Sequence, residues 1–325
     1  MPWMVMLTQV LLPLALLAWV ALYPAAGWLA WGLQLVSVTL ALLGIGLAAL
    51  WTVPPFWVAY TYGLLLLLIT TTHLFRKGLP GPGLWRASLA NSVMIVIATV
   101  PGLLGGYLTW HAMKGRMLPG EAVVNIAPPF TPGHYLIAHG GSTPLINVHL
   151  KTLNPTVERF LLWRGQSKAL DIFRVTPLGF HTNGWQPTDP ARYTTFGVPV
   201  LSPCRGDVAL VVDGLEDMPV PQMDRNHMAG NHIAIDCGGF FLILAHLRQG
   251  SIVVATGDRV KTGDVLGQMG NSGNSSQPHL HLHAQRGLPK EAPLAGEPVW
   301  LTIDDRFLVR NDRLRVFDTD NDRFR

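Results

Sequence analysis

Three histidines alternate along one short stretch near the C-terminus, SSQPHLHLHAQRG, at positions 279, 281 and 283. Side chains two residues apart lie on the same face of a strand, so His279 and His281 would present both rings to one place. A solvated strand face that happens to use histidine is the plainer interpretation. A metal centre is the more specific one, because catalytic zinc takes three protein ligands beside an open position, and a neighbouring imidazole can move protons.

The first 113 residues contain no Asp or Glu, and their only Lys and Arg residues are Arg76, Lys77 and Arg86. A membrane helix needs about 20 apolar residues, and Pro- and Gly-containing breaks divide this region into four such runs. The predicted spans are residues 4–22, 27–52, 56–75 and 88–111. Two or three spans remain the alternative, because the first boundaries rest only on Pro and Gly. We therefore expect a multispan transmembrane region over residues 1–113.

The charged loop predicts the orientation of this region. Basic residues stay on the cytoplasmic side of a membrane, so the loop holding Arg76, Lys77 and Arg86 should be cytoplasmic. The last span then carries the C-terminal part out, whereas Lys114 and Arg116 favour the opposite orientation. We expect a multi-pass protein of the bacterial cell membrane, in contact with lipid, whose C-terminal domain is periplasmic or extracellular.

Composition also excludes some functions. Outside the first 113 residues, the basic residues are nearly balanced by the 20 Asp and Glu residues, so no basic stripe predicts nucleic-acid binding. His73 lies at the edge of a span, and the predicted spans contain no Asp, Glu, Lys or Arg, which argues against an ion or proton pump. Recognition of a small lipid or a neutral solute by the membrane region stays open.

The rest of the chain has the pattern of a β domain. A Pro- and Gly-rich linker is expected over residues 114–134, and short alternating apolar runs separated by Gly, Pro, Asn and Asp fill residues 135–325. This pattern is typical of an all-β antiparallel sheet or barrel. The two cysteines, Cys204 and Cys237, could form a disulfide in an oxidising compartment or remain two buried thiols.

The segment GNHIAIDCGGFFLILAHLRQGSIVVATGDRVKTGDVLGQMGNSGNSSQPHLHLHAQ resembles the C-terminal signature of the LytM/lysostaphin-type zinc metallopeptidases, the Gly-Gly endopeptidase family. The resemblance implies one zinc ion per chain, with His281 as a ligand. It implies that His279 and His246 are the catalytic imidazoles. His283 stands where the family commonly has Glu, and would be a neighbour of the ligand or a groove residue. His232 would have a structural or surface role.

The ligands that precede His281 in the sequence are harder to identify, because the short H-x-x-x-D motif of the family is absent. One candidate pair is His149 with Asp171, and the other is His181 with Asp189. The first pair lies in apolar, strand-like runs that could hold ligands rigidly, and some family members resemble it. The second lies in a Gly- and Pro-rich loop better suited to lining a groove. We favour metal ligation by His149, Asp171 and His281.

These features predict a membrane-anchored zinc metalloendopeptidase, with peptide bonds in the peptidoglycan stem or cross-bridge as the substrate that the resemblance implies. The alternative is a LytM-like domain of weak or no activity that binds and activates other cell-wall hydrolases. The long insertion between Asp213 and Gly230 would wall the cleft or carry a regulatory contact.

Overall fold

The computed structural model describes residues 2–78 and 89–317 of the chain. It divides into two compact units, Met1–Lys114 and Gly115–Arg325. Arg86, one of the three residues that predicted the orientation, lies outside the described residues, as does the first residue of the predicted span 88–111.

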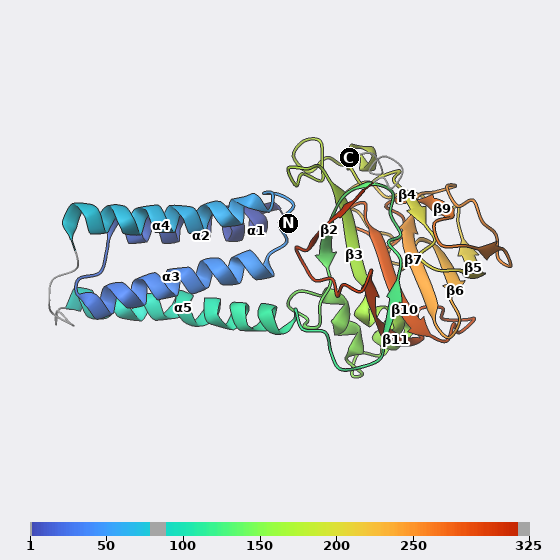
Figure 1. The fold of residues 1–325 in the computed structure, drawn as a ribbon, viewed down its shortest axis with the longest axis horizontal. Coiled ribbons are helices and arrows are strands. Elements are labelled where there is room, and N and C mark those ends of the chain that lie inside the picture. Colours follow the sequence, from blue (N-terminus) through green and yellow to red (C-terminus); the bar gives the residue numbers. More distant parts are fainter. Residues whose placement is uncertain (1, 79–88, 318–325) are drawn as a thin grey trace. The chain divides into compact units, whose positions relative to one another are not determined.

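Long apolar helices make up the first unit (Figure 1). They are α1 (Pro2–Val5), the π-helical η1 (Met6–Leu11), α2 (Leu12–Leu22), α3 (Trp28–Ala48), α4 (Trp57–Lys77) and α5 (Leu89–Lys114). Among the described residues, four stretches are long and apolar enough to cross a membrane: Trp3–Leu22, Trp28–Ala48, Trp57–Arg76 and Ile95–Lys114. The prediction of four such helices is confirmed, and they fit a membrane anchor.

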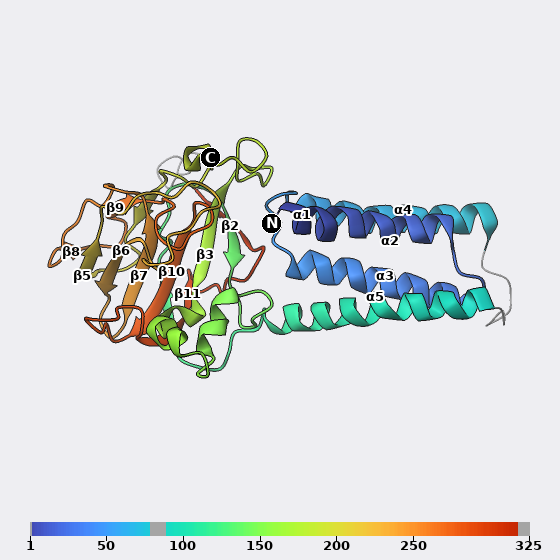
Figure 2. The same cartoon turned by 180° about the vertical axis from the view of Figure 1, so that it is seen from behind.

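Small residues let α3 and α5 approach closely along their length (Figures 1 and 2). A Cβ atom added at Gly105 would collide with the backbone of Ala41, and one at Gly102 would lie 2.6 Å from the Ser37 hydroxyl. Contacts between small residues are a usual means of packing helices in lipid. The outward side chains are large and apolar, with Leu64 66% and Leu103 76% exposed, as a lipid-facing surface requires.

The second unit contains twelve strands in its described residues. They are β1 (Val123–Ile126), β2 (Gly133–His139), β3 (Leu170–Val175), β4 (Pro199–Leu201), β5 (Gly206–Val212), β6 (Asn231–Asp236), β7 (Phe241–Leu247), β8 (Arg259–Val260), β9 (Val265–Gln268), β10 (Leu280–Arg286), β11 (Glu297–Ile303) and β12 (Arg313–Val316). Three 3₁₀ helices accompany them: η2 (Val148–Leu153), η3 (Glu158–Lys168) and η4 (Pro190–Arg192).

Ten strands form one large, mainly antiparallel sheet (Figure 2). Eight of them follow the order β12-β2-β3-β10-β7-β6-β5-β8, and β1 and β11 lie off this path. β11 continues the sheet beside β10, β1 pairs with β11 in parallel, and β4 and β9 form a separate two-stranded sheet. The expected antiparallel β domain is confirmed.

Part of the predicted linker is a strand. Residues 123–126, inside the expected linker 114–134, form β1, whose register aligns Val123 with Trp300 and Ile126 with Ile303. The flanking Pro and Gly residues suggested a connection, but Val123, Val124 and Ile126 find an apolar partner strand far along the sequence. Local composition cannot reveal a pairing of this kind.

The alternation of β10 divides its side chains between two environments. Leu280 and Leu282 enter the main apolar core with Leu244 of β7. His281 pairs with Asp171 of β3 on one side and with Ala245 of β7 on the other, so it projects from the opposite face. The core thus holds the strand that presents the polar residues.

Cys204, which follows β4, and Cys237, which follows β6, form a disulfide. Of the two alternatives open from the sequence, the structure has the bridge. It fastens the end of β6 to the turn before β5.

Candidate metal centre

Three side chains from separate elements converge on one point: His149 of η2, Asp171 of β3 and His281 of β10. The Nε2 atom of His149 lies 2.9 Å from Asp171 Oδ2, and the Nδ1 atom of His281 lies 2.9 Å from Asp171 Oδ1. One donor atom from each residue lies within 4.8 Å of the others. The structure therefore brings together the three residues favoured as ligands, although His149 and Asp171 are 22 positions apart.

Asn147 fixes the turn that presents His149. Its side-chain oxygen accepts a hydrogen bond from the His149 backbone N–H at 3.2 Å, which caps η2. Its amide nitrogen donates to the carbonyls of Gly141 and Ala169, both at 3.1 Å. Because Asn147 is fully buried, these bonds tie the start of η2 to the approach to β3.

Gln285 sets the orientation of the His283 ring. The Gln285 amide nitrogen donates to the backbone carbonyls of Gly287 and Pro293, both at 2.7 Å, so its Oε1 atom is the one that faces His283. That oxygen lies 3.2 Å from His283 Nε2 and can only accept. His283 therefore carries its proton on Nε2 and leaves Nδ1 as an acceptor.

The acceptor on His283 in turn determines the position of the proton on His281. His283 Nδ1 lies 3.0 Å from His281 Nε2, so His281 donates its Nε2–H and keeps a lone pair on Nδ1. That lone pair faces Asp171 Oδ1, itself an acceptor, at 2.9 Å. Burial lowers the pKa of His281 to about 4, in spite of the opposing effect of Asp171, so a proton does not fill the contact near neutral pH.

Two facing acceptors at this distance repel each other, and a cation between them would stabilise the contact. Two neutral imidazoles and one carboxylate form the donor set that suits zinc, and the residues present fit it. His149, Asp171 and His281 would hold the ion. The hydrogen bonds of His283 and Gln285 would orient the ligand beyond it, as partners of metal-bound histidines usually do.

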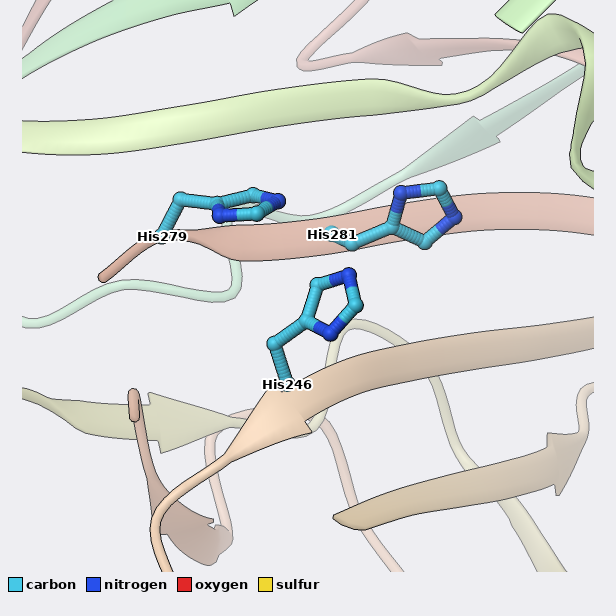
Figure 3. A group of neighbouring side chains, drawn as sticks. All are labelled: His246, His279 and His281. Atoms are coloured by element: carbon cyan, nitrogen blue, oxygen red, sulfur yellow. The ribbon is translucent and has the colours of Figure 1, made fainter. Parts of the chain in front are cut away.

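Two further histidines border the cluster, His279 on the residue before β10 and His246 near the end of β7. His246 Nδ1 donates to the Ser272 carbonyl at 2.8 Å, and His279 Nδ1 to the Gln277 carbonyl at 2.9 Å. In both rings Nδ1 thus carries a proton. The Nε2 atom of His246 can accept another proton, whereas the Nε2 atom of His279 faces Asp171 Oδ1 at 3.5 Å. Figure 3 shows the far nitrogen of His246 pointing toward the strand that carries His279 and His281.

The backbone of His246 has a φ of 61°, the left-handed region that non-glycine residues seldom adopt. Its N–H donates to the Ala229 carbonyl and its carbonyl accepts from Gly270, both at 3.0 Å. The surrounding loops thus impose this conformation, which costs on the order of 1–3 kcal/mol and is concentrated at functional sites. It turns the His246 ring toward the cluster.

Charge in the cluster is carried by Asp171. Burial would raise the pKa of this carboxyl, but His149 and His279 outweigh it and hold the pKa well below its ordinary value. Burial opposes protonation of His279, yet the charge of Asp171 and the hydrogen bonds raise its pKa. Burial, with the neighbouring His279 and His281, lowers the pKa of His246. The two bordering imidazoles therefore differ: His279 suits a proton donor, and His246 a neutral acceptor.

His139 and Arg310 also belong to the site, and sequence reasoning missed them. His139 of β2 pairs with Asp171 across the sheet, and its ring lies edge-on to His149 at 5.8 Å. Arg310 donates to His139 Nδ1 at 2.8 Å and to the carbonyls of Ala138 and Leu145, both at 3.0 Å. Burial lowers the pKa of His139 to about 3, so the ring is neutral.

Gln285 was missed too, although the alternation that singled out His279, His281 and His283 extends to it by two more residues. His139 ends an apolar run, which was its only signal. Arg310 had none, because its role depends on a turn that the sequence does not show.

The competing pair does not form part of this cluster. His181 Nε2 lies 3.2 Å from Gln277 Oε1, and the Asp189 carboxylate caps η4 by accepting the Ala191 N–H at 2.9 Å. Within residues 2–78 and 89–317, two groups could hold a metal, His149 with Asp171 and His281, and His246 with His279 and His281, and neither contains His181 or Asp189. His232 lies on β6, where its Nδ1 atom bonds the Gly230 carbonyl at 2.8 Å.

The comparison with protein families gives one match, in which residues 192–293 fit the model of Peptidase family M23. The matched segment contains His246, His279 and His281 but stops short of His149 and Asp171. The assignment of His149 and Asp171 as ligands therefore depends on the sequence pattern and on the geometry, and not on this match.

A curated relative, Peptidoglycan DD-endopeptidase ShyA of Vibrio cholerae, is 32% identical over 125 residues, which are 37% of this chain and 26% of the relative. The chain thus spans about a quarter of the relative's length. Among solved structures, a zinc-containing peptidase from Vibrio cholerae is 28% identical over 28% of this chain and 24% of its own, with a TM-score of 0.23. The catalytic domain of lysostaphin from Staphylococcus simulans is 20% identical over 35% of this chain and 84% of its own, also with a TM-score of 0.23.

Proposed function

Residues 192–293 form a peptidase family M23 domain, and from this premise we propose that the chain is a membrane-anchored zinc metalloendopeptidase that cleaves peptide bonds in peptidoglycan. The convergence of His149, Asp171 and His281 beside His246 and His279 carries the proposal. The 32% identity with a segment of a peptidoglycan DD-endopeptidase supports the substrate class.

The side chains divide the work by their protonation. A zinc ion held by His149, Asp171 and His281 would supply a Lewis acid and would lower the pKa of water bound there. His246, neutral and with Nε2 unprotonated, accepts a proton from the attacking water. His279, with its raised pKa, donates to the developing oxyanion or to the departing amine. The negative charge of Asp171 offsets the positive charge that the imidazoles carry during this proton transfer.

The four apolar helices would fix this domain to a bacterial cell membrane, with the lipid as their solvent. The basic residues Arg76 and Lys77 at the end of α4 favour a cytoplasmic loop there, and so support a β domain on the periplasmic or outer side. The disulfide between Cys204 and Cys237 suits that compartment, because cytosolic thiols are normally kept reduced.

A digestion of purified peptidoglycan by the full chain in detergent tests the proposal. We expect released peptides from the wild type, none after treatment with a chelator, and recovery when zinc is restored. The Asp171→Ala variant should release none. A folded wild type that holds one zinc per chain and still cuts no peptide would favour the alternative, a domain that binds and activates other cell-wall hydrolases.

A further inference from the structure

A 380 Å³ pocket lies in the β domain on the same face of the sheet as the metal centre. His283 of β10 is aligned with Ile243 of β7, and Ile243 with Ala234 of β6, so these three side chains share one face. His232, two residues before Ala234, lies on that face and lines the pocket. The pocket therefore continues the surface that begins at His281.

Both walls of the pocket are bonded to the site. One wall comes from the insertion, where Ala229 accepts the backbone N–H of His246 at 3.0 Å. The other includes Pro293, whose carbonyl accepts from Gln285 at 2.7 Å. A molecule in the pocket would thus lie between the segments that position His246 and His283.

His232 lines this space and has an unused acceptor. It is only 9% exposed, and its Nδ1–H donates to the Gly230 carbonyl at 2.8 Å, so Nε2 carries the lone pair. That Nε2 atom is buried and has no hydrogen-bond partner within the described part of the chain. A buried acceptor left without a donor costs about 1–3 kcal/mol. A ligand with a donor group would remove this cost.

The rest of the lining indicates what carries the donor. Trp163, Val212, Met228 and Leu294 give the pocket apolar walls, and Glu291 adds a carboxylate. Apolar walls accept an aliphatic stem, while an acceptor nitrogen and a carboxylate favour a positively charged donor. We propose that this pocket binds an aliphatic side chain ending in a primary ammonium, carried by the peptide that the enzyme cleaves. The proposal rests on the proposed peptidase function.

Peptide binding to the full chain in detergent, followed by fluorescence anisotropy, tests the pocket apart from catalysis. The probes are a labelled, alanine-rich peptide with one lysine and the same peptide acetylated on the lysine amine. We expect the free amine to bind about tenfold more tightly or better, because acetylation removes a charge-assisted bond to a buried acceptor. His232→Phe should abolish this preference, and His232→Gln, which keeps an acceptor, should retain part of it.

His227→Phe is the matched control, because this histidine lines the same pocket but already pairs with Asp224 at 2.6 Å. It should keep the preference. Should His232→Phe fail to fold, Val212→Trp must abolish the preference by filling the pocket. Equal binding of the two peptides, or a preference that survives His232→Phe, would overturn the proposal. If the protein cleaves peptidoglycan but shows no preference for the free amine, the pocket proposal is wrong and the peptidase function is retained. If the protein prefers the free amine but binds no zinc, the proposed peptidase function is wrong and the pocket proposal is retained.

Discussion

His281 Nε2 and His283 Nδ1 lie 3.0 Å apart, so the proton on His281 points away from the metal centre. The partner that accepts this proton is a histidine, and Gln285 holds that histidine in turn. The pair therefore fixes which nitrogen of His281 is available to a metal.

Two substitutions separate the hydrogen bonds that His283 makes with His281 and Gln285 from the volume of its side chain. His283→Gln can still accept from His281 and donate to Gln285, so we expect zinc affinity close to that of the wild type. His283→Leu keeps a side chain of similar volume but accepts nothing, and should weaken zinc binding by about 10–100-fold. Competition with a chromophoric chelator measures both. Equal affinities for the two variants would contradict this role.

Asp171 and Asp189 provide a matched pair for the carboxylate ligand. Asp171→Ala should lose zinc, because it removes the oxygen that faces both His149 and His281. Asp189→Ala removes only a helix cap and should retain one zinc per chain, at a stability cost of about 1 kcal/mol. Metal content of the purified full-length variants decides between them. Retention by Asp171→Ala would transfer the ligand role to another residue.

Substitution of the bordering histidines should impair turnover without releasing the metal. His279→Gln and His246→Asn remove the proton-transfer groups, and asparagine tolerates the left-handed backbone of His246. We expect kcat to fall by about 10²–10⁴-fold with zinc content unchanged. Loss of zinc from either variant would place that histidine among the ligands instead.

Acid should destabilise the metal-free β domain well above the range in which carboxyls titrate. Burial lowers the pKa of five histidines: that of His139 to about 3, that of His281 to about 4, and those of His232, His246 and His283 below the ordinary value. Their ordinary pKa is 6.5, so between that value and the folded one the unfolded chain binds more protons. Stability contributed by these groups is therefore complete above about pH 6.5 and lost as the pH falls.

His279 works in the opposite direction, because its raised pKa contributes stability that is lost as the pH rises. Five groups against one predict a net loss on acidification. Urea unfolding of the chelator-treated chain at about pH 7 and about pH 4.5 should show a lower midpoint at the acidic value. His139→Gln should reduce the difference. A midpoint independent of pH would show that these histidines are accessible and protonated in the folded state.

The disulfide offers a test of location. If the β domain lies outside the cytoplasm, Cys204 and Cys237 should resist alkylation in intact cells until a reductant is added. The bridge closes a span of 33 residues, for which its loss should cost about 3–4 kcal/mol. Two freely alkylated cysteines in cells would place the domain in the cytoplasm.

The sequence by itself determined the features that depend on local pattern. Runs of about 20 apolar residues predict membrane-crossing helices because lipid leaves the backbone no other partner. The alternation of His279, His281 and His283 predicted rings on one face of a strand because side chains two apart share a face, and β10 carries His281 and His283 with His279 directly before it. The 56-residue segment from Gly230 to Gln285 resembled the family's spacing closely enough to predict the fold and to single out the histidines that we propose as catalytic.

Only the tertiary structure decided the groupings that depend on contacts between distant segments. It brought Asp171 between His149 and His281 and left Asp189 as a helix cap, because cross-strand register rather than spacing places a side chain. It joined β1 to β11, and it gave Gln285 the two carbonyls that fix the proton on His283. Proton positions and metal sites depend on such contacts between distant segments, and the local sequence pattern does not predict those contacts.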